Sequence, residues 1–453
     1  MNKPAYSRFS LALFLAGAGL RILLFLANPA WNSFDNHFEP ISLIMSTGAI
    51  PHLNSCFECY QPPVFYAISA FFAQIVLVFG ITGVYLVKVL QSLSCFYGIL
   101  HLAVIYLILR KLPLSDFARI IAFATVCFLP QHIYISAMNS NDTISYLAVS
   151  FCLYLFLAAY EWNLALPWLV LLSIAVTATI FTKYTALAII PAMMLTLVIM
   201  RLRRAIVSTK KMLIAAGVIF LLPLACLGFY CASNVRNYGS ALPWNNAILN
   251  PAQTQPKAEK INFFDFHPAG VMKNTIIYPG ILGSFWTQLY AKMWFDFEPK
   301  FLYFTDRNDS WWDGYYRWIR GEAAFPAGVM RFSLFTRFLE FCLLMLGLVP
   351  LLLLIAGIVR LRDIKMLIFP LLLLFNLAVV IWLTVVSPVY SSMKAVYLLN
   401  SLPAMAVLIA AGTMWFERYI AAKRVICVFF TLLPALVIAH ILHIVWSAGF
   451  FSL

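Results

Sequence analysis

The sequence predicts an all-α polytopic membrane protein, and three observations carry this prediction. The chain has 453 residues, and 63% of them are hydrophobic, with a mean hydropathy of +0.89. Charged residues make up only 11% of the chain. Apolar runs long enough to form a membrane-spanning helix recur from one end to the other. A soluble core cannot bury this much apolar surface, so the helices are expected to face lipid.

The net charge of +14 is explained by membrane topology, and no nucleic-acid partner is expected. The Lys and Arg residues fall largely into four short clusters between apolar runs, at 110–119, 201–211, 360–365 and 418–424. Short loops rich in Lys and Arg stay on the cytoplasmic side of a membrane. If all four clusters lie there, the apolar segments between successive clusters must cross the membrane in pairs.

This constraint predicts about eleven transmembrane helices, with a cytoplasmic N-terminus and an outer C-terminus. The first helix, from Phe9 to about Pro29, is longer than the ~7–15 apolar residues of a signal peptide, so it is interpreted as an uncleaved anchor. The other ten are expected at 84–109, 119–138, 143–160, 165–182, 185–200, 212–232, 332–358, 366–387, 398–416 and 425–446.

One further apolar segment, at 62–80, is expected to lie at the outer interface. Counting it as a crossing helix would move every later basic cluster to the outside. It therefore belongs to a first external loop at 30–83, within an N-terminal transmembrane module at 1–232. A large external loop at 233–331 and C-terminal helices within 332–453 complete the predicted organisation.

The large loop combines aromatic rings with carboxylates. Trp and Tyr can stack on sugar rings while carboxylates accept hydrogen bonds from sugar hydroxyls. An aromatic belt at the lipid headgroups explains the same rings, and a sugar site at the interface would use both. The residues concerned are Trp286, Trp294, Asp296, Glu298, Tyr303, Asp306, Asp309, Trp311, Trp312, Asp313, Tyr315, Tyr316 and Trp318.

Two of the nine cysteines, Cys56 and Cys59, lie in the first external loop, whereas the others lie in apolar spans. A small loop-locking disulfide is favoured if the compartment is oxidising. Half of a metal site is the alternative, with His52 as the nearest further ligand, but no second Cys or His cluster accompanies it. The sequence predicts no required cofactor; a divalent cation is compatible with it but not predicted.

Polar residues collect at the predicted outer ends of helices that lie far apart in sequence. A carboxylate base beside several cations suits a phosphate-linked donor, because cations stabilise the departing phosphate while the base deprotonates an acceptor hydroxyl. Each residue also has a simpler explanation, such as a helix cap for an aspartate or a snorkelling side chain for a cation. The residues are Asp35, His37, Asp142, Lys183, Arg236, Lys394 and Tyr397.

The order of short motifs resembles GT-C-type glycosyltransferases, in particular the branch of protein O-mannosyltransferases and lipid A aminoarabinose transferases. The motifs are FDNHFEP after span one, YQPPVFY before the interfacial helix, SNDTIS after span three, FTKYTAL at the end of span five, Arg-Asn-Tyr after span seven and MKAVYLLNSLP before a late span. Such enzymes transfer a sugar from a polyprenyl-phosphate carrier to a hydroxyl on the outer side of the membrane, usually with inversion.

The resemblance implies roles for the residues within these motifs. Asp35 would be the catalytic base, and His37 would help to bind the acceptor or the phosphate. Asp142 would support the site, and Tyr397 would orient Lys394 or line the pocket. The candidates for binding the carrier phosphate are Lys183, Arg236 and Lys394.

One departure from the motifs concerns the donor. Aminoarabinose transferases carry a lysine before the Pro-Pro pair, where this chain has Gln61. Either another cation holds the phosphate or the donor differs.

The expected partners are a polyprenyl-phosphate-linked sugar, membrane lipids, and a hydroxyl acceptor on a lipid, glycan or protein. The expected location is a bacterial inner membrane, with the active site on the outer face. A polysaccharide polymerase or ligase is an alternative that would use arginines in place of an aspartate base. A lipid or saccharide transporter is another, and it predicts charges deep within spans, where only Arg21 is found.

Overall fold

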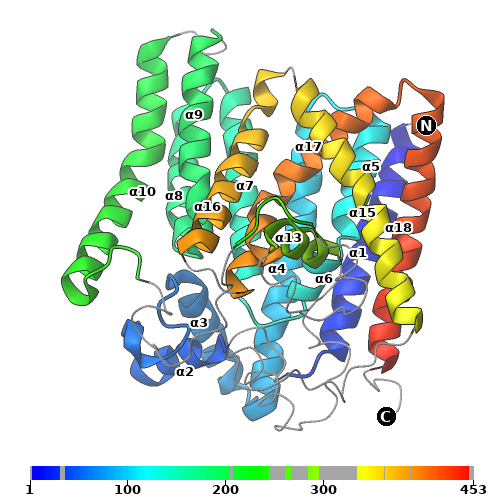
Figure 1. Cartoon of the computed structure of the whole chain (residues 1–453). Coiled ribbons are helices and arrows are strands. Elements are labelled where there is room, and N and C mark those ends of the chain that lie inside the picture. Colours follow the sequence, from blue (N-terminus) through cyan, green and yellow to red (C-terminus); the bar gives the residue numbers. More distant parts are fainter. Residues whose placement is uncertain are drawn as a thin grey trace.

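The computed structural model describes residues 3–30, 36–204, 208–243, 261–266, 284–294, 334–361, 363–386 and 390–447. Within these ranges the ordered elements are helices, and nine of them are long and apolar enough to cross a membrane. They stand side by side as one bundle (Figure 1). The predicted class, an all-helical integral membrane protein, is confirmed.

The nine long helices account for most of the bundle. Two of them begin with a 3-10 turn, η2 (Tyr184–Ala188) before α9 and η6 (Ala395–Ser401) before α17. The long helices are α1 (Lys3–Ala27), α4 (Gly83–Lys111), α7 (Asp142–Glu161), α9 (Ile189–Leu202), α10 (Thr209–Tyr238), α15 (Leu334–Arg360), α16 (Ile368–Val386), α17 (Leu402–Phe416) and α18 (Ile420–Ser447).

Shorter helices fill the remaining positions. They are α2 (Phe38–Thr47), α3 (Val64–Val78), α5 (Asp116–Cys127), α6 (Pro130–Ile135), α8 (Leu166–Ile180) and α13 (Phe285–Trp294). Short 3-10 turns occur at η1 (Leu53–Ser55), η4 (Ile364–Met366) and η5 (Tyr390–Met393). Helix α10 runs past the predicted end of its span at residue 232 and stops at Gly239, whose φ of +73° favours glycine.

The predicted number of eleven crossings is not confirmed. Helices α5 and α8, of 12 and 15 residues, are too short to be counted among the nine. In the first case the reason is Pro130, because a residue before proline disfavours the helical conformation and α5 ends at Cys127. Both segments still connect the two ends of the bundle, since α5 leads through α6 into the start of α7 and α8 leads back from its end.

The basic clusters gather at one end of the bundle. Lys111 pairs with Glu161, and the Arg360 guanidinium carbon lies 4.7 Å from the centre of the Trp415 ring. Lys423 lies 5.2 Å from the centre of the Phe117 ring. The ends of α9 and α10 that flank the 201–211 cluster lie at this end too (Figure 1). This basic end matches the arrangement that the charge pattern predicts.

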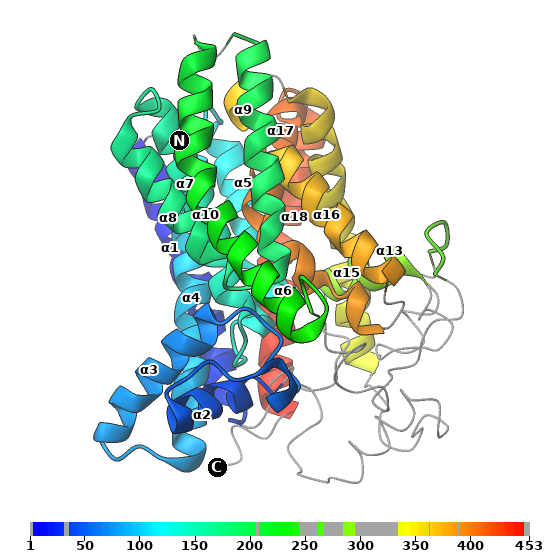
Figure 2. The same cartoon turned by 90° about the vertical axis from the view of Figure 1, so that its left-hand side faces the viewer.

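Helices α2 and α3 lie at the opposite end of the bundle (Figure 2). They pack on each other and on the start of α4 through a small core of their own, which includes Ile41, Phe65 and Leu90. The segment predicted at 62–80 is therefore a short helix at the end of the bundle and is not one of its long helices. We call the end that carries α2 and α3 the site end.

A fully buried arginine joins three helices in the core. Arg21 on α1 donates from Nη1 to the carbonyl oxygens of Gly17 at 2.7 Å and Cys127 at 3.0 Å. The break between α5 and α6 leaves the Cys127 carbonyl without its usual amide partner in the helix, and Arg21 replaces that partner. Arg21 Nη2 also lies 2.6 Å from Nδ1 of His132 on α6.

The polar chain continues from His132 into α4 and α7. His132 Nε2 lies 2.8 Å from His101 Nδ1, and His101 Nε2 lies 2.8 Å from Ser150 Oγ. Because Arg21 can only donate, His132 accepts at Nδ1 and donates from Nε2, and His101 in turn donates to Ser150. All four residues are completely buried. The chain of hydrogen bonds thus has one direction and couples α1, α6, α4 and α7.

Replacing Arg21 with methionine is expected to lower the free energy of unfolding by about 3 kcal/mol, because buried carbonyl and imidazole acceptors lose their donor. The measurement is thermal unfolding of the purified protein in detergent. Arg8→Gln is the control, since Arg8 lies on the same helix but is exposed. Equal unfolding temperatures for the Arg21→Met and Arg8→Gln variants would contradict this account.

Candidate functional site

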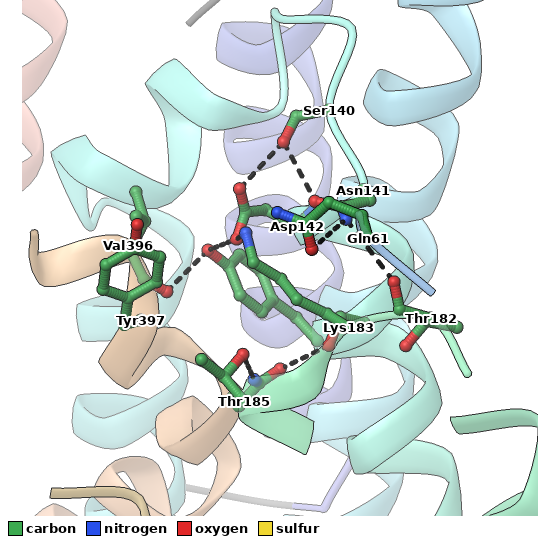
Figure 3. A network of polar contacts seen from close by, with 12 residues as sticks. Gln61, Ser140, Asn141, Asp142, Thr182, Lys183, Thr185, Val396 and Tyr397 are labelled. Carbon is green, nitrogen blue, oxygen red and sulfur yellow. Dashed lines mark hydrogen bonds and ion pairs between the residues drawn. The ribbon is translucent and has the colours of Figure 1, made fainter. Parts of the chain in front are cut away.

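A buried ion pair lies at the centre of the site end (Figure 3). Asp142 is the first residue of α7, and Lys183 follows α8; their Oδ1 and Nζ atoms are 2.5 Å apart. The two side chains are 7% and 8% exposed, whereas in the other two ion pairs of the described residues each side chain is at least 20% exposed. Removing two charges from water costs free energy, so a pair this deeply buried needs further polar partners to hold it in the interior.

Further donors hold the Asp142 carboxylate in one orientation. The Ser140 hydroxyl donates to Oδ2 at 2.8 Å. The Tyr146 hydroxyl lies 3.2 Å from Oδ1 and 2.7 Å from the Val396 carbonyl oxygen, so its single proton serves both acceptors. The carboxylate also sits at the N-terminus of α7, where the helix dipole favours a negative charge. Asp142 is thus well placed to position the Lys183 ammonium.

The first loop reaches this ion pair through Gln61. Its Oε1 accepts from Asn141 Nδ2 at 3.4 Å, and its Nε2 donates to the Tyr60 hydroxyl at 2.8 Å and to Glu58 Oε2 at 3.3 Å. The backbone of Val64 at the start of α3 donates to Phe181 at 3.0 Å, which ties the loop to the end of α8. Gln61 therefore lies beside Asn141, the residue before Asp142, and its role in binding the donor stays a prediction.

A disulfide closes the same loop. Cys56 and Cys59 are joined, with their Cα atoms 5.1 Å apart, and both side chains are buried. The structure therefore contains the disulfide and not the alternative half of a metal site, because sulfurs joined in a disulfide do not act as thiolate ligands of a metal. Elsewhere in the described part of the chain, no group of three or more His, Cys, Asp or Glu side chains is arranged to hold a metal ion.

The third contribution comes from η6. Lys183 Nζ lies 5.4 Å from the centre of the Tyr397 ring, and Asn376 of α16 donates to the Tyr397 carbonyl oxygen at 3.0 Å. Lys394 immediately precedes η6, is 8% exposed, and accepts at its carbonyl oxygen from the Tyr397 backbone at 3.2 Å. Lys183 and Tyr397, which come from segments far apart in sequence, thus lie close together beside Asp142, and the Lys183 ammonium can bind an anionic group.

Two predicted residues lie elsewhere in the structure. His37 is 2% exposed and belongs to the α2–α3 core, where its Nδ1 lies 2.9 Å from the Tyr66 hydroxyl. Arg236 is exposed near the end of α10. In the same Arg-Asn-Tyr motif it is Tyr238 that contacts the first loop, at 3.1 Å from His52 Nδ1. The functional roles of His37 and Arg236 remain predictions.

Asp35 lies outside the described residues, and so do the aromatic and acidic residues predicted between 296 and 318. The residues that precede Asp35 are anchored at the site end. Asn28 Nδ2 donates to the Ala137 carbonyl oxygen at 2.7 Å, and Gln91 Nε2 donates to the carbonyl oxygens of Pro29 and Ala30 at 3.0 Å each. The chain therefore leaves α1 beside the segment that leads into α7.

Sequence reasoning missed several residues of the site. Tyr146 is four residues after Asp142 and so shares its helix face, a spacing that could have identified it. Glu58, which is 3% exposed and contacts Gln61, carries only the weak signal of a charge between two cysteines. The His101–His132 contact joins residues 31 positions apart in two predicted spans, and no local pattern in the sequence indicates it.

Comparisons with known proteins agree with this fold. Residues 60–228 match the family model described as dolichyl-phosphate-mannose-protein mannosyltransferase. The apo oligosaccharyltransferase of Archaeoglobus fulgidus is similar at 13% identity and a TM-score of 0.52, over 97% of this chain and 56% of that chain. Its complex with Zn and sulfate gives 15% identity and a TM-score of 0.53, over 95% and 53%.

A weaker structural match is ArnT from Cupriavidus metallidurans in the apo state, at 17% identity and a TM-score of 0.39, over 89% of this chain and 77% of that chain. No curated protein matches the chain. The chain spans about half the length of the archaeal oligosaccharyltransferase, and at this low identity that likeness shows the fold alone. The predicted resemblance to GT-C-type glycosyltransferases is confirmed by the family match and by the helical fold.

Replacing Asp142 with alanine is expected to destabilise the protein by about 3 kcal/mol or more, because Lys183 is left buried without its counter-ion. Adding Lys183→Met to that variant is expected to restore part of the loss, since no unpaired charge remains. The measurement is again thermal unfolding in detergent.

Glu161→Ala provides the control for this pair. Lys111 and Glu161 also lie 2.5 Å apart, but both side chains are partly exposed, so breaking them is expected to cost under about 1 kcal/mol. The account of the Asp142–Lys183 pair is wrong if Asp142→Ala costs no more than Glu161→Ala.

Proposed function

We propose that this protein is a membrane glycosyltransferase that moves a sugar from a polyprenyl-phosphate-linked donor to a hydroxyl acceptor. The main support is that residues of the candidate site lie within the part of the chain that matches the family model. The matched residues, 60–228, contribute Gln61, Asn141, Asp142 and Lys183, which are the residues that meet at the site end. The description of the matched family names a dolichyl-phosphate-linked mannose as donor.

The lysines supply the positive charge that such a donor requires. Lys183 Nζ has three donors, of which Asp142 uses one, so the others are free to contact a phosphate oxygen. Lys394, which is buried immediately before η6, is the proposed second cation. When the bond between the sugar and the phosphate breaks, negative charge builds up on the leaving phosphate, and fixed cations stabilise it.

Asp35 is the proposed base. It removes a proton from the acceptor hydroxyl, whose oxygen attacks the anomeric carbon from the side opposite the phosphate. The polyprenyl phosphate leaves with the electrons of the broken bond, and the sugar is transferred with inversion. Asp142 is less suited to this role, because its carboxylate already accepts from Lys183, Ser140 and Tyr146.

The site end is the proposed outer face of a bacterial inner membrane. The basic end then faces the cytoplasm, together with the N-terminus. The acceptor hydroxyl belongs to a lipid, a glycan or a protein. Helix α3, which exposes Phe71 and Val78, lies at the outer interface in this arrangement.

A transfer assay tests the activity and the base together. Membranes containing the wild type or Asp35→Asn are supplied with radiolabelled polyprenyl-phosphate hexoses. The variant is expected to lose transfer by about 100-fold or more, because general base catalysis contributes at least that much. Lys183→Gln is expected to lose transfer as well, through weaker stabilisation of the leaving phosphate.

Glu161→Gln at equal abundance is the control, because Glu161 lies at the opposite end of α7. Transfer that survives Asp35→Asn unchanged would remove Asp35 as the base but keep the enzyme class. Absence of transfer by the wild type from every hexose donor, with lipid, glycan and peptide acceptors supplied, would count against the proposed function.

Reporter fusions test the orientation independently of activity. Alkaline phosphatase, which is active only outside the cytoplasm, is expected to be active when fused after Gly239 at the end of α10. The same fusion after Arg204 at the end of α9 is expected to be inactive. The reverse pattern would invert the proposed topology.

A further inference from the structure

A cavity at the basic end has no part in the sugar-transfer site. It has a volume of about 230 Å³ and lies where the α4–α5 turn meets the ends of α15 and α17 and the start of α16. The Asp142–Lys183 pair lies at the other end of the bundle. The residues of the cavity wall that matter to the argument are Leu114, Arg360, Asp363, Met366, Trp415 and Arg418.

Two guanidinium groups dominate the charge of this cavity. Arg360 and Arg418 are both exposed, and neither forms an ion pair with another described residue. Arg360 is stacked over the Trp415 ring at 4.7 Å, which holds its planar fork in one orientation. Guanidinium forks match the oxygens of a phosphate group, and two of them at one cavity favour an anionic ligand.

Two carboxylates close to these arginines in sequence, Asp363 and Glu417, already accept hydrogen bonds. Asp363 accepts from the backbone N–H of Lys365 at 2.8 Å, as the cap of η4. Glu417 accepts from the Ser115 hydroxyl at 2.9 Å. The cavity wall is otherwise apolar, with Leu114 and Met366 buried in it. The ligand that fits is therefore anionic at one end and tolerant of apolar surroundings.

The position of the cavity at the ends of candidate membrane spans favours a lipid headgroup over a soluble phosphate as the anion. Arg360 is the last residue of a membrane-spanning candidate, and Arg418 follows the last residue of another by two positions. These helix ends lie at the level of lipid headgroups. Val359, next to Arg360 in the chain, and Ile420, two residues after Arg418, are 72% and 74% exposed, as residues that face acyl chains are. These exposed apolar side chains can contact the acyl chains of a lipid, but they would add nothing to the binding of a soluble phosphate ion.

The wall between α15 and α17 is closed to acyl chains. A Cβ atom added to Gly357 would lie 1.9 Å from the Leu408 carbonyl oxygen, and one added to Gly412 would lie 1.9 Å from that of Leu353. Only glycine allows the two backbones to approach this closely. A lipid can therefore place its headgroup in the cavity while its chains run along the outside of the bundle.

We propose that this cavity binds the headgroup phosphate of an anionic membrane phospholipid through Arg360 and Arg418. Basic pockets between transmembrane helices on the positively charged side of a membrane protein are suited to such headgroups. The bound lipid would join the ends of α15 and α17 to the α4–α5 turn. This proposal does not depend on sugar transfer, and its test needs no enzymatic activity.

Native mass spectrometry of the intact protein in detergent tests the proposal with phosphatidylglycerol and phosphatidylcholine as probes. The wild type is expected to retain phosphatidylglycerol in preference to phosphatidylcholine. The double variant Arg360→Gln/Arg418→Gln is expected to lose that preference by about tenfold or more, since two charge-assisted hydrogen bonds are removed. Arg418→Gln alone removes an exposed side chain that forms no ion pair with another described residue, so this variant is expected to fold normally and to show an intermediate loss.

Arg203→Gln/Lys210→Gln is the matched control, because it removes the same charge from exposed positions on α9 and α10 at the same end of the bundle. This control is expected to retain the preference. Equal retention by the wild type and the Arg360→Gln/Arg418→Gln variant would overturn the proposal. Displacement of phosphatidylglycerol by excess inorganic phosphate would also overturn it and assign the cavity to a soluble anion instead.

Discussion

The interaction on which the bundle depends is the contact of Arg21 with the break between α5 and α6. A helix interrupted in the membrane leaves carbonyl oxygens without donors, and no water is present there to satisfy them. Arg21 supplies the donor for Cys127 and also fixes the orientation of His132. The transporter alternative predicts buried charges that line a substrate path. The hydrogen bonds of Arg21 to a helix end and to a histidine explain its burial without such a path.

The same break between α5 and α6 also positions Asp142 for the candidate site. Because α6 is short, the chain turns back at Asn139–Asn141 and begins α7 with Asp142 inside the bundle. Tyr146, one turn further along α7, contacts both His101 and His132 with its ring and Asp142 with its hydroxyl. The buried polar chain in the core and the Asp142–Lys183 pair are thus parts of one structure. Rigid support of this kind suits the proposed role of Lys183 in holding a charged substrate.

The cations at the two ends of the molecule differ in burial, and the phosphate groups proposed for them differ accordingly. At the site end Lys183 and Lys394 are buried, which suits the proposed stabilisation of charge that develops only during the reaction. At the basic end the two arginines are exposed and unpaired among the described residues, which suits a ligand that is always charged. The long helices keep these two sites apart, on opposite sides of the membrane in the proposed topology.

Hydropathy and charge are local properties of a sequence, and they determined the helical class, the basic end and the position of the 62–80 segment outside the set of long helices. The polar residues at predicted helix ends also identified the segments that carry Asp142, Lys183 and Tyr397, and the family resemblance identified Gln61. The pairing of Asp142 with Lys183 depends on how helices rotate and pack against one another, so only the tertiary structure decided it. For the same reason the structure alone placed His37 in the α2–α3 core and Arg236 on the surface. Nine of the eleven predicted crossings are long helices in the described part of the chain, whereas the other two correspond to α5, which ends before Pro130, and to α8, and both are too short to be counted by length.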